Sequence, residues 1–122
     1  MANPDGPEAG SPTSQIDTQL AELRESFRPR LAERVEEIAA QWETVRPVLA
    51  DPAARELLRR LHRLAHSLAG TAGTFGFTAA GDVSRALERR LERAGADPAP
   101  ADASEIALLV AALSRMAELP PG

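Results

Sequence analysis

Apolar residues recur at steps of three and four along the first half of this chain, and that spacing places them on one face of an α-helix. Pro29 interrupts the pattern, and an interior proline removes a backbone hydrogen bond and crowds the preceding turn. We therefore expect a short helix ending near Phe27, a break or kink, and a longer helix ending near Arg46. The stripe comprises Ile16, Leu20, Leu23, Phe27, Leu31, Val35, Ile38, Trp42, Val45 and Leu49.

Three further amphipathic segments follow, with start and stop signals at their ends. Asp51 followed by Pro52 is typical of a helix start, because the Asp side chain caps free amides and proline suits the first helical position. Gly76 suits the left-handed residue that ends a helix, and two more helices are expected over residues 78–95 and from Asp102 onward. Such helices bury their stripes only against one another. The sequence thus predicts an all-α fold, an antiparallel four-helix bundle with a short additional N-terminal helix.

The composition favours helices and excludes several classes of protein. Alanine supplies 24 of the 122 residues and aromatic residues only 3%, a balance that favours helix over sheet. The absence of cysteine removes disulfides, thiolate metal sites and cysteine nucleophiles. The net charge of −4 argues against nucleic-acid binding, which needs a cationic surface. No apolar run approaches the ~20 residues that span a bilayer, so we expect no membrane helix.

The chain begins with a segment rich in proline and glycine. Residues 1–14 contain no hydrophobic stretch and no basic leader, so we expect a disordered tail there and not a secretory signal. Residues 15–119 are then expected to form the helical bundle. Because nothing in this segment directs the chain elsewhere, we expect a cytoplasmic protein, and we expect it to be a monomer.

His66 is expected to face water. Helical-wheel positions at roughly 100° per residue put it about 140° from Leu61 and about 160° from Leu68, both members of the expected apolar stripe. The same exposed face is expected to carry His62 one turn earlier, Ala69 and Gly70 one turn later, and Gly73 two turns later.

Two glycines on one exposed helical face invite an explanation, because a mid-helix glycine costs about 1 kcal/mol relative to alanine. Bare backbone at Gly70 and Gly73 clears space for another molecule to approach the imidazole. On these features alone two other interpretations stay open. A surface histidine is usually only solvated, and small residues often let a neighbouring helix pack closely.

The segment around His66 resembles the signature of a known family. Residues 65–77, with the sequence AHSLAGTAGTFGF, resemble the His-x-Leu-Lys/Ala-Gly-x-x-x-x-x-Gly pattern of histidine-containing phosphotransfer (HPt) domains in bacterial phosphorelays. The family's fold is a helical bundle of about this size. The resemblance implies that His66 is the phosphorylated histidine, that Leu68 is the buried leucine and that Gly70 is the family's glycine.

One position departs from the family pattern. The residue three after the histidine is often a lysine that helps to neutralise the phosphoryl group, and here it is Ala69. Arg63, three residues before His66 and on an adjacent strip of the helix, is the candidate to supply that charge, although it is equally expected to be solvated or paired with a glutamate. Arg85 on the next helix is a weaker candidate.

The resemblance also implies a mechanism and a set of partners. An exposed imidazole is largely neutral near pH 7 and attacks phosphorus through a ring nitrogen. The donor would be an aspartyl phosphate in a response-regulator receiver domain or a hybrid histidine kinase. That partner, and not this chain, would bring the acidic pocket and Mg²⁺. This chain would be a phosphoryl carrier without cofactor or kinase activity, because it has no glycine-rich ATP loop.

The charge distribution agrees with an acidic partner. Residues 55–93 hold eight arginines against four acidic residues, a local charge of +4, whereas the rest of the chain carries −8. A receiver's acidic face would be attracted to these middle helices, more strongly at low salt. Many of these arginines are equally explained as solubilising the outer faces of the bundle.

Two alternatives remain at this point. The first is a helical adaptor that docks on a receiver or another signalling partner without chemistry, and the missing lysine at Ala69 keeps it open. The second is a metal site formed by His62 and His66, which are spaced i,i+4. No third ligand stands in register with them, so we expect no metal here and place His62 at the edge of the docking surface.

Overall fold

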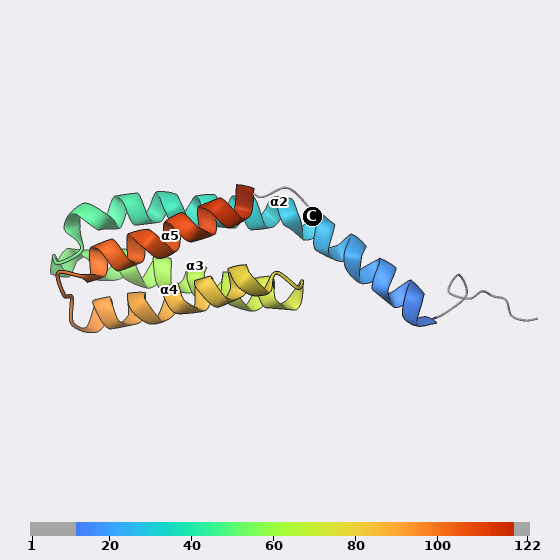
Figure 1. The fold of residues 1–122 in the computed structure, drawn as a ribbon. Helices are drawn as coiled ribbons and strands as arrows, with labels where there is room; N and C mark the ends of the chain where they lie inside the picture. The colour runs from blue at the N-terminus through green and yellow to red at the C-terminus, as the bar shows by residue number, and fades with distance from the viewer. Residues whose placement is uncertain (1–11, 119–122) are drawn as a thin grey trace, which may run out of the picture.

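The computed structural model describes residues 12–118, which form four α-helices joined by short turns. Figure 1 shows two layers, with α2 and α5 in one and α3 and α4 in the other. The helices are α2 (Pro12–Val45), α3 (Arg55–Thr74), α4 (Thr78–Ala96) and α5 (Asp102–Glu118), and two 3-10 turns, Arg46–Val48 and Pro52–Ala54, connect α2 to α3. The predicted all-α four-helix bundle is confirmed.

The N-terminal boundary differs from the prediction. Residues 12–14 already belong to α2, so the expected tail over residues 1–14 extends too far, and its first eleven residues lie outside those described. The predicted separate N-terminal helix is also wrong, because α2 runs without a break through Pro29. Figure 1 shows a change of direction where the helix leaves the bundle, so of the two expected alternatives the helix has a kink and not a break. Phe27 and Leu31, buried on either side of Pro29, stabilise the continuous helix against the proline's cost.

The helix ends follow the signals in the sequence. Asp51 accepts a hydrogen bond from the Ala53 backbone N–H at 2.9 Å and caps the turn that leads into α3. Gly76 adopts a φ of +84° after the end of α3, as expected for a left-handed residue. This turn is held against α2, since Phe27 stacks on Phe75 with ring centroids 4.7 Å apart and the Arg24 Nε–H donates to the Phe75 carbonyl at 3.2 Å.

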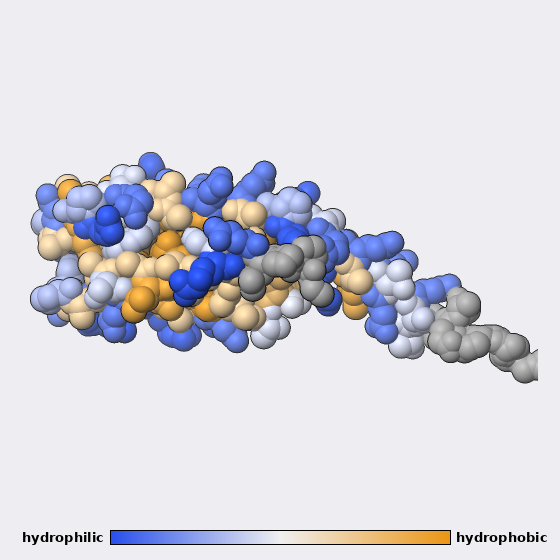
Figure 2. Space-filling view, turned by 45° about the horizontal axis from the view of Figure 1, so that its top comes forward, coloured by the Kyte–Doolittle hydropathy of each residue, from blue (hydrophilic) through white to orange (hydrophobic). Residues whose placement is uncertain are grey.

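The core fills the space between the two layers and draws on every helix. Figure 2 shows apolar residues along the middle of the bundle and hydrophilic residues over much of the surface around them. The largest fully buried side chains are Trp42 and Ile38 from α2, Leu61 and Leu68 from α3, Leu87 and Leu91 from α4, and Ile106 and Leu113 from α5. Burying side chains of this size stabilises the fold by roughly 2 kcal/mol each before conformational entropy is counted.

The buried face of α3 is rotated from the one that its leucine pattern predicts, which is Leu57, Leu61, Leu64 and Leu68. Leu57 and Leu64 are only half-buried, whereas Leu58 and Ala65 are buried, together with Ala69 and Ala72. The reason is that α4 packs closely on this side. A Cβ placed on Gly81 would lie 3.5 Å from the Ala69 carbonyl oxygen and 3.5 Å from the Gly73 amide nitrogen, so the two helices meet nearly backbone to backbone.

Asp102 joins α4 to the start of α5. Its carboxylate is fully buried and accepts hydrogen bonds from the Ala99 backbone N–H at 2.7 Å and from Arg93 at 3.2 Å, with Arg90 at 3.4 Å. Asp102 with Glu105 three residues later is the pattern of a capping box, but the Glu105 N–H bonds the Ala101 carbonyl instead. The buried carboxylate is therefore satisfied by the preceding loop and by α4.

We expect Asp102→Ala to lower the free energy of unfolding by about 2 kcal/mol, because it leaves the Ala99 N–H and the two arginines without their shared acceptor. Both arginines are partly exposed, which keeps the cost below that of a fully buried pair. Urea unfolding measures the change. Asp97→Ala, at an exposed position in the same connection, should change stability by less than about 0.5 kcal/mol. Equal effects of the two substitutions would contradict this account.

Candidate functional site

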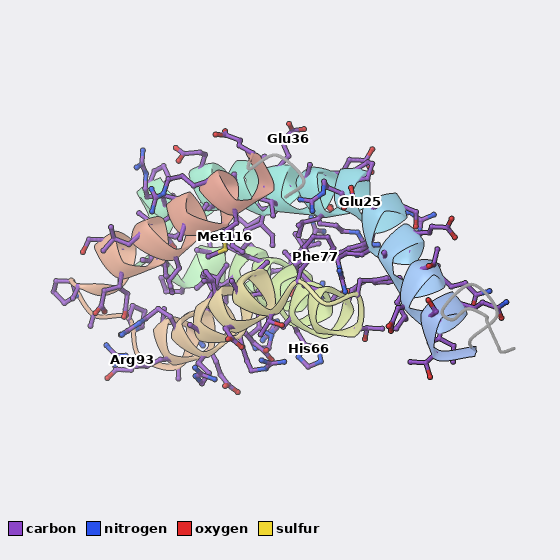
Figure 3. The ribbon with its side chains drawn as sticks, turned by 45° about the vertical axis from the view of Figure 1, so that its right-hand side comes forward. Glu25, Glu36, His66, Phe77, Arg93 and Met116 are labelled. Atoms are coloured by element: carbon purple, nitrogen blue, oxygen red, sulfur yellow. The ribbon has the colours of Figure 1, made fainter. Side chains whose placement is uncertain are left out.

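His66 lies midway along α3 on the outer side of the bundle. Figure 3 shows its ring pointing away from α2 and α5. Its side chain is 72% exposed, so a second molecule can reach the imidazole without any rearrangement of the helices. The structure thus confirms that His66 is exposed, as the helical wheel predicts.

Glu88 on α4 holds the His66 ring. Its Oε2 atom lies 2.6 Å from His66 Nδ1, and its side chain is much less exposed than the histidine, at 20%. A carboxylate only accepts hydrogen bonds, so Nδ1 carries the proton in this pair. The other ring nitrogen, Nε2, then has its lone pair available for attack on an electrophile. The pairing orients the ring and selects its tautomer.

Sequence reasoning missed Glu88, although a signal was present. Residues 75–77 form the tight turn between two antiparallel helices, so residues at similar separations on either side of it face each other. His66 lies ten residues before Gly76, and Glu88 lies twelve residues after it. Folding the hairpin about its glycine would have brought these two side chains together.

His62 is the second member of the site. Its ring is half-buried, and its Nε2 lies 3.8 Å from the same Glu88 oxygen that bonds His66. The two imidazoles are nearly parallel, with ring centroids 6.4 Å apart. The distance to Glu88 is too long for a hydrogen bond, so His62 borders the site and His66 is the ring that Glu88 fixes.

Gly70 and Gly73 leave open space beside the imidazole. A Cβ added at either glycine would meet nothing within 4 Å, so the packing of this bundle does not require glycine at these positions. Close packing against α4 explains Gly81, Ala69 and Ala72, but it does not explain the two exposed glycines. The two glycines destabilise the helix without improving its packing, which favours the interpretation that they leave space for a partner molecule to approach His66.

Ala69 does not belong to that open surface, which corrects the expectation from the sequence. Its side chain is buried, and its backbone carbonyl lies close to Gly81 of α4. The helical wheel places it only about 60° from His66, but on the side that α4 covers. The position where many HPt domains carry a lysine thus faces inward in this chain, and any cation for a phosphoryl group must come from elsewhere.

The two candidate arginines, Arg63 and Arg85, are both engaged with other acids. Arg63 Nη2 lies 3.9 Å from Glu56 Oε2, and Arg85 Nη1 lies 3.4 Å from Asp82 Oδ1. All four side chains are at least half exposed, and such pairs contribute little to stability. Each guanidinium is therefore free to exchange its acid for a stronger anion.

Residues 12–118 contain neither a metal-binding cluster nor a membrane-spanning helix. No group of three or more His, Cys, Asp or Glu side chains there is arranged to hold a metal ion, so the alternative of a metal site at His62 and His66 gains no support. Within the same residues, no helix has the length and apolar character to cross a membrane.

Comparison with known families agrees with the geometry. The family model described as the Hpt domain matches residues 22–118, which is most of the chain. The chain therefore belongs to the Hpt family, whose domains carry phosphoryl groups in phosphorelays and are not kinases. Hpt domains interact with receiver domains and histidine kinases. Comparison with curated proteins and with solved structures finds no match.

Proposed function

We propose that His66 accepts a phosphoryl group from a receiver-domain aspartate and passes it on in a two-component phosphorelay. The observation that carries the proposal is the exposed imidazole whose Nδ1 is held by Glu88 at 2.6 Å. That contact leaves Nε2 as the nucleophile, and the open backbone at Gly70 and Gly73 gives a partner room to approach it.

The transfer follows from this arrangement. The Nε2 lone pair attacks phosphorus, the bond between phosphorus and the aspartate oxygen breaks, and its electron pair leaves with the carboxylate. The proton on Nδ1 stays in place, so the phosphorylated ring carries a positive charge that the Glu88 carboxylate balances. No general base is needed, because the attacking nitrogen has no proton to lose. The receiver is expected to supply Mg²⁺ and the acidic pocket.

Arg63 is our candidate for the cation that meets the phosphoryl group. Its present partner, Glu56, is exposed, and the pair is long at 3.9 Å. A phosphoryl group carries more charge than a carboxylate and binds a guanidinium in bidentate fashion. His62 borders the ring and contributes to the docking surface, along with the basic outer faces of α3 and α4.

Labelling of the chain by a phosphorylated receiver domain tests the proposal. We expect a label that is labile in acid and stable in base, as a phosphorus–nitrogen bond is, and that maps to His66 by mass spectrometry. Tight binding without label would favour the adaptor, a partner-docking module without chemistry. Label on a carboxylate or hydroxyl side chain would overturn the proposal.

Glu88→Gln is expected to slow labelling of His66 roughly tenfold, because the neutral amide neither fixes the Nδ1–H tautomer nor balances the charge on the phosphorylated ring. Nitrogen NMR of the imidazole should show a smaller share of the Nδ1–H tautomer. Glu92→Gln, one turn further along α4, is the matched control and should leave both measurements unchanged. An unaltered labelling rate in Glu88→Gln would contradict the role given to this carboxylate.

A further inference from the structure

The N-terminal end of α2 carries an apolar stripe that the bundle does not cover. Ile16, Leu20 and Leu23 are 53%, 51% and 50% exposed, although they continue the line of Phe27, which is buried against Phe75 and Phe77. Figure 1 shows this end of α2 projecting beyond the other helices. From the side drawn in Figure 2 the projecting end is mainly hydrophilic, with some apolar residues where it leaves the bundle.

The family relationship does not account for this stripe. The match to the Hpt domain begins at residue 22, so Ile16 and Leu20 precede it. Three large apolar side chains aligned on one helical face and half open to water are typical of a surface that another helix covers. None of the helices in residues 12–118 takes that place.

The charged residues beside the stripe would pair with each other if two copies of the helix packed antiparallel. On one flank lie Asp17 and Arg24, seven residues apart, and on the other lie Gln19 and Ser26, which carry no charge. In an antiparallel pair of identical helices related by a two-fold axis near Leu20, the same flank meets itself with its direction reversed. Asp17 of each copy then stands opposite Arg24 of the other, and the two Leu20 side chains lie side by side near the axis.

Arg24 can bind Asp17 of a second copy while it keeps its contact within the bundle. Its Nε–H bonds the Phe75 carbonyl at 3.2 Å and fixes the stem of the side chain at the end of the bundle. A guanidinium has five donor hydrogens, so the terminal nitrogens remain for a carboxylate of a second copy. The hairpin turn at Gly76 thus holds the arginine at the edge of the stripe.

We propose that two copies of this chain associate through residues 13–26 of α2, packed antiparallel about Leu20. This proposal differs from the monomer expected from the sequence. His66 lies on the outer side of the α3–α4 layer, so both acceptor histidines remain accessible in the dimer. The contact area is small, and the dimer is therefore concentration-dependent.

Sedimentation of the full chain from about 10 μM to about 1 mM measures the association. We expect the mass to rise from one chain toward two, and Leu20→Glu to weaken the dimer at least tenfold, because it places two glutamates together at the axis. Leu108→Glu is the matched control, since Leu108 is a leucine exposed by 69% on α5 and should not alter the association.

Charge reversal tests the antiparallel arrangement. Asp17→Arg alone is expected to weaken the dimer, because two arginines then face each other on each side, and combining it with Arg24→Asp should restore association. A single chain at every concentration, or a dimer that Leu20→Glu leaves intact, would overturn the proposal. A monomeric wild type whose receiver binding is weakened by Leu20→Glu would assign the stripe to the receiver instead. Labelling of His66 does not depend on these outcomes.

Discussion

His66→Gln is expected to abolish labelling of the chain by a phosphorylated receiver domain. Glutamine has no ring nitrogen with a lone pair aimed at phosphorus, and Glu88 has no second imidazole within hydrogen-bond distance to orient in its place. The substitution should leave the free energy of unfolding within about 0.5 kcal/mol of the wild type, because the side chain is exposed. Phosphate incorporation and thermal unfolding, measured on one preparation, separate the two effects.

His62→Gln is the matched control for this experiment. It removes the neighbouring imidazole, one helical turn away, and keeps the Glu88 contact to His66. We expect it to retain most of the labelling. Label that persists in His66→Gln and disappears in His62→Gln would show that the acceptor is the half-buried ring, contrary to the proposal.

The sequence predicts those parts of the fold in which a single residue has a strong preference for one backbone conformation. Gly76 adopts its left-handed conformation and Asp51 caps its turn, because the backbone at each position admits few alternatives. The exposure of His66 followed from its angle to Leu61 and Leu68, which are both fully buried. Periodicity therefore determined the bundle and the outward direction of the acceptor ring.

The errors arose where packing between helices decides the outcome. Pro29 does not end a helix, since contacts at Phe27 and Leu31 outweigh a local cost that sequence rules treat in isolation. Ala69 is buried because α4 approaches α3 closely at Gly81, and a pattern based on leucines gives small residues too little weight in defining the inner face. Glu88 came from another helix, so no motif around His66 could include it.

Gly70→Gln is expected to stabilise the fold and impair transfer. Glutamine is a better helix former than glycine, so the free energy of unfolding should rise by about 0.5 kcal/mol, and its Cβ meets nothing within 4 Å. The same side chain would stand one turn from His66, where a receiver's aspartate must approach. A displacement of about 1 Å at the reacting atoms costs roughly 100-fold, and we expect a loss of that size in the labelling rate.

This pairing of opposite effects separates a docking role of Gly70 from a structural one. If the glycine served the packing of the bundle, Gly70→Gln would lower stability and activity together. Ala111→Gln, at an exposed position on α5, adds a side chain of the same size to a helix in the other layer and should leave labelling unchanged. Wild-type labelling in Gly70→Gln would mean that the partner does not approach over this backbone, and the cost of the two glycines would need another explanation.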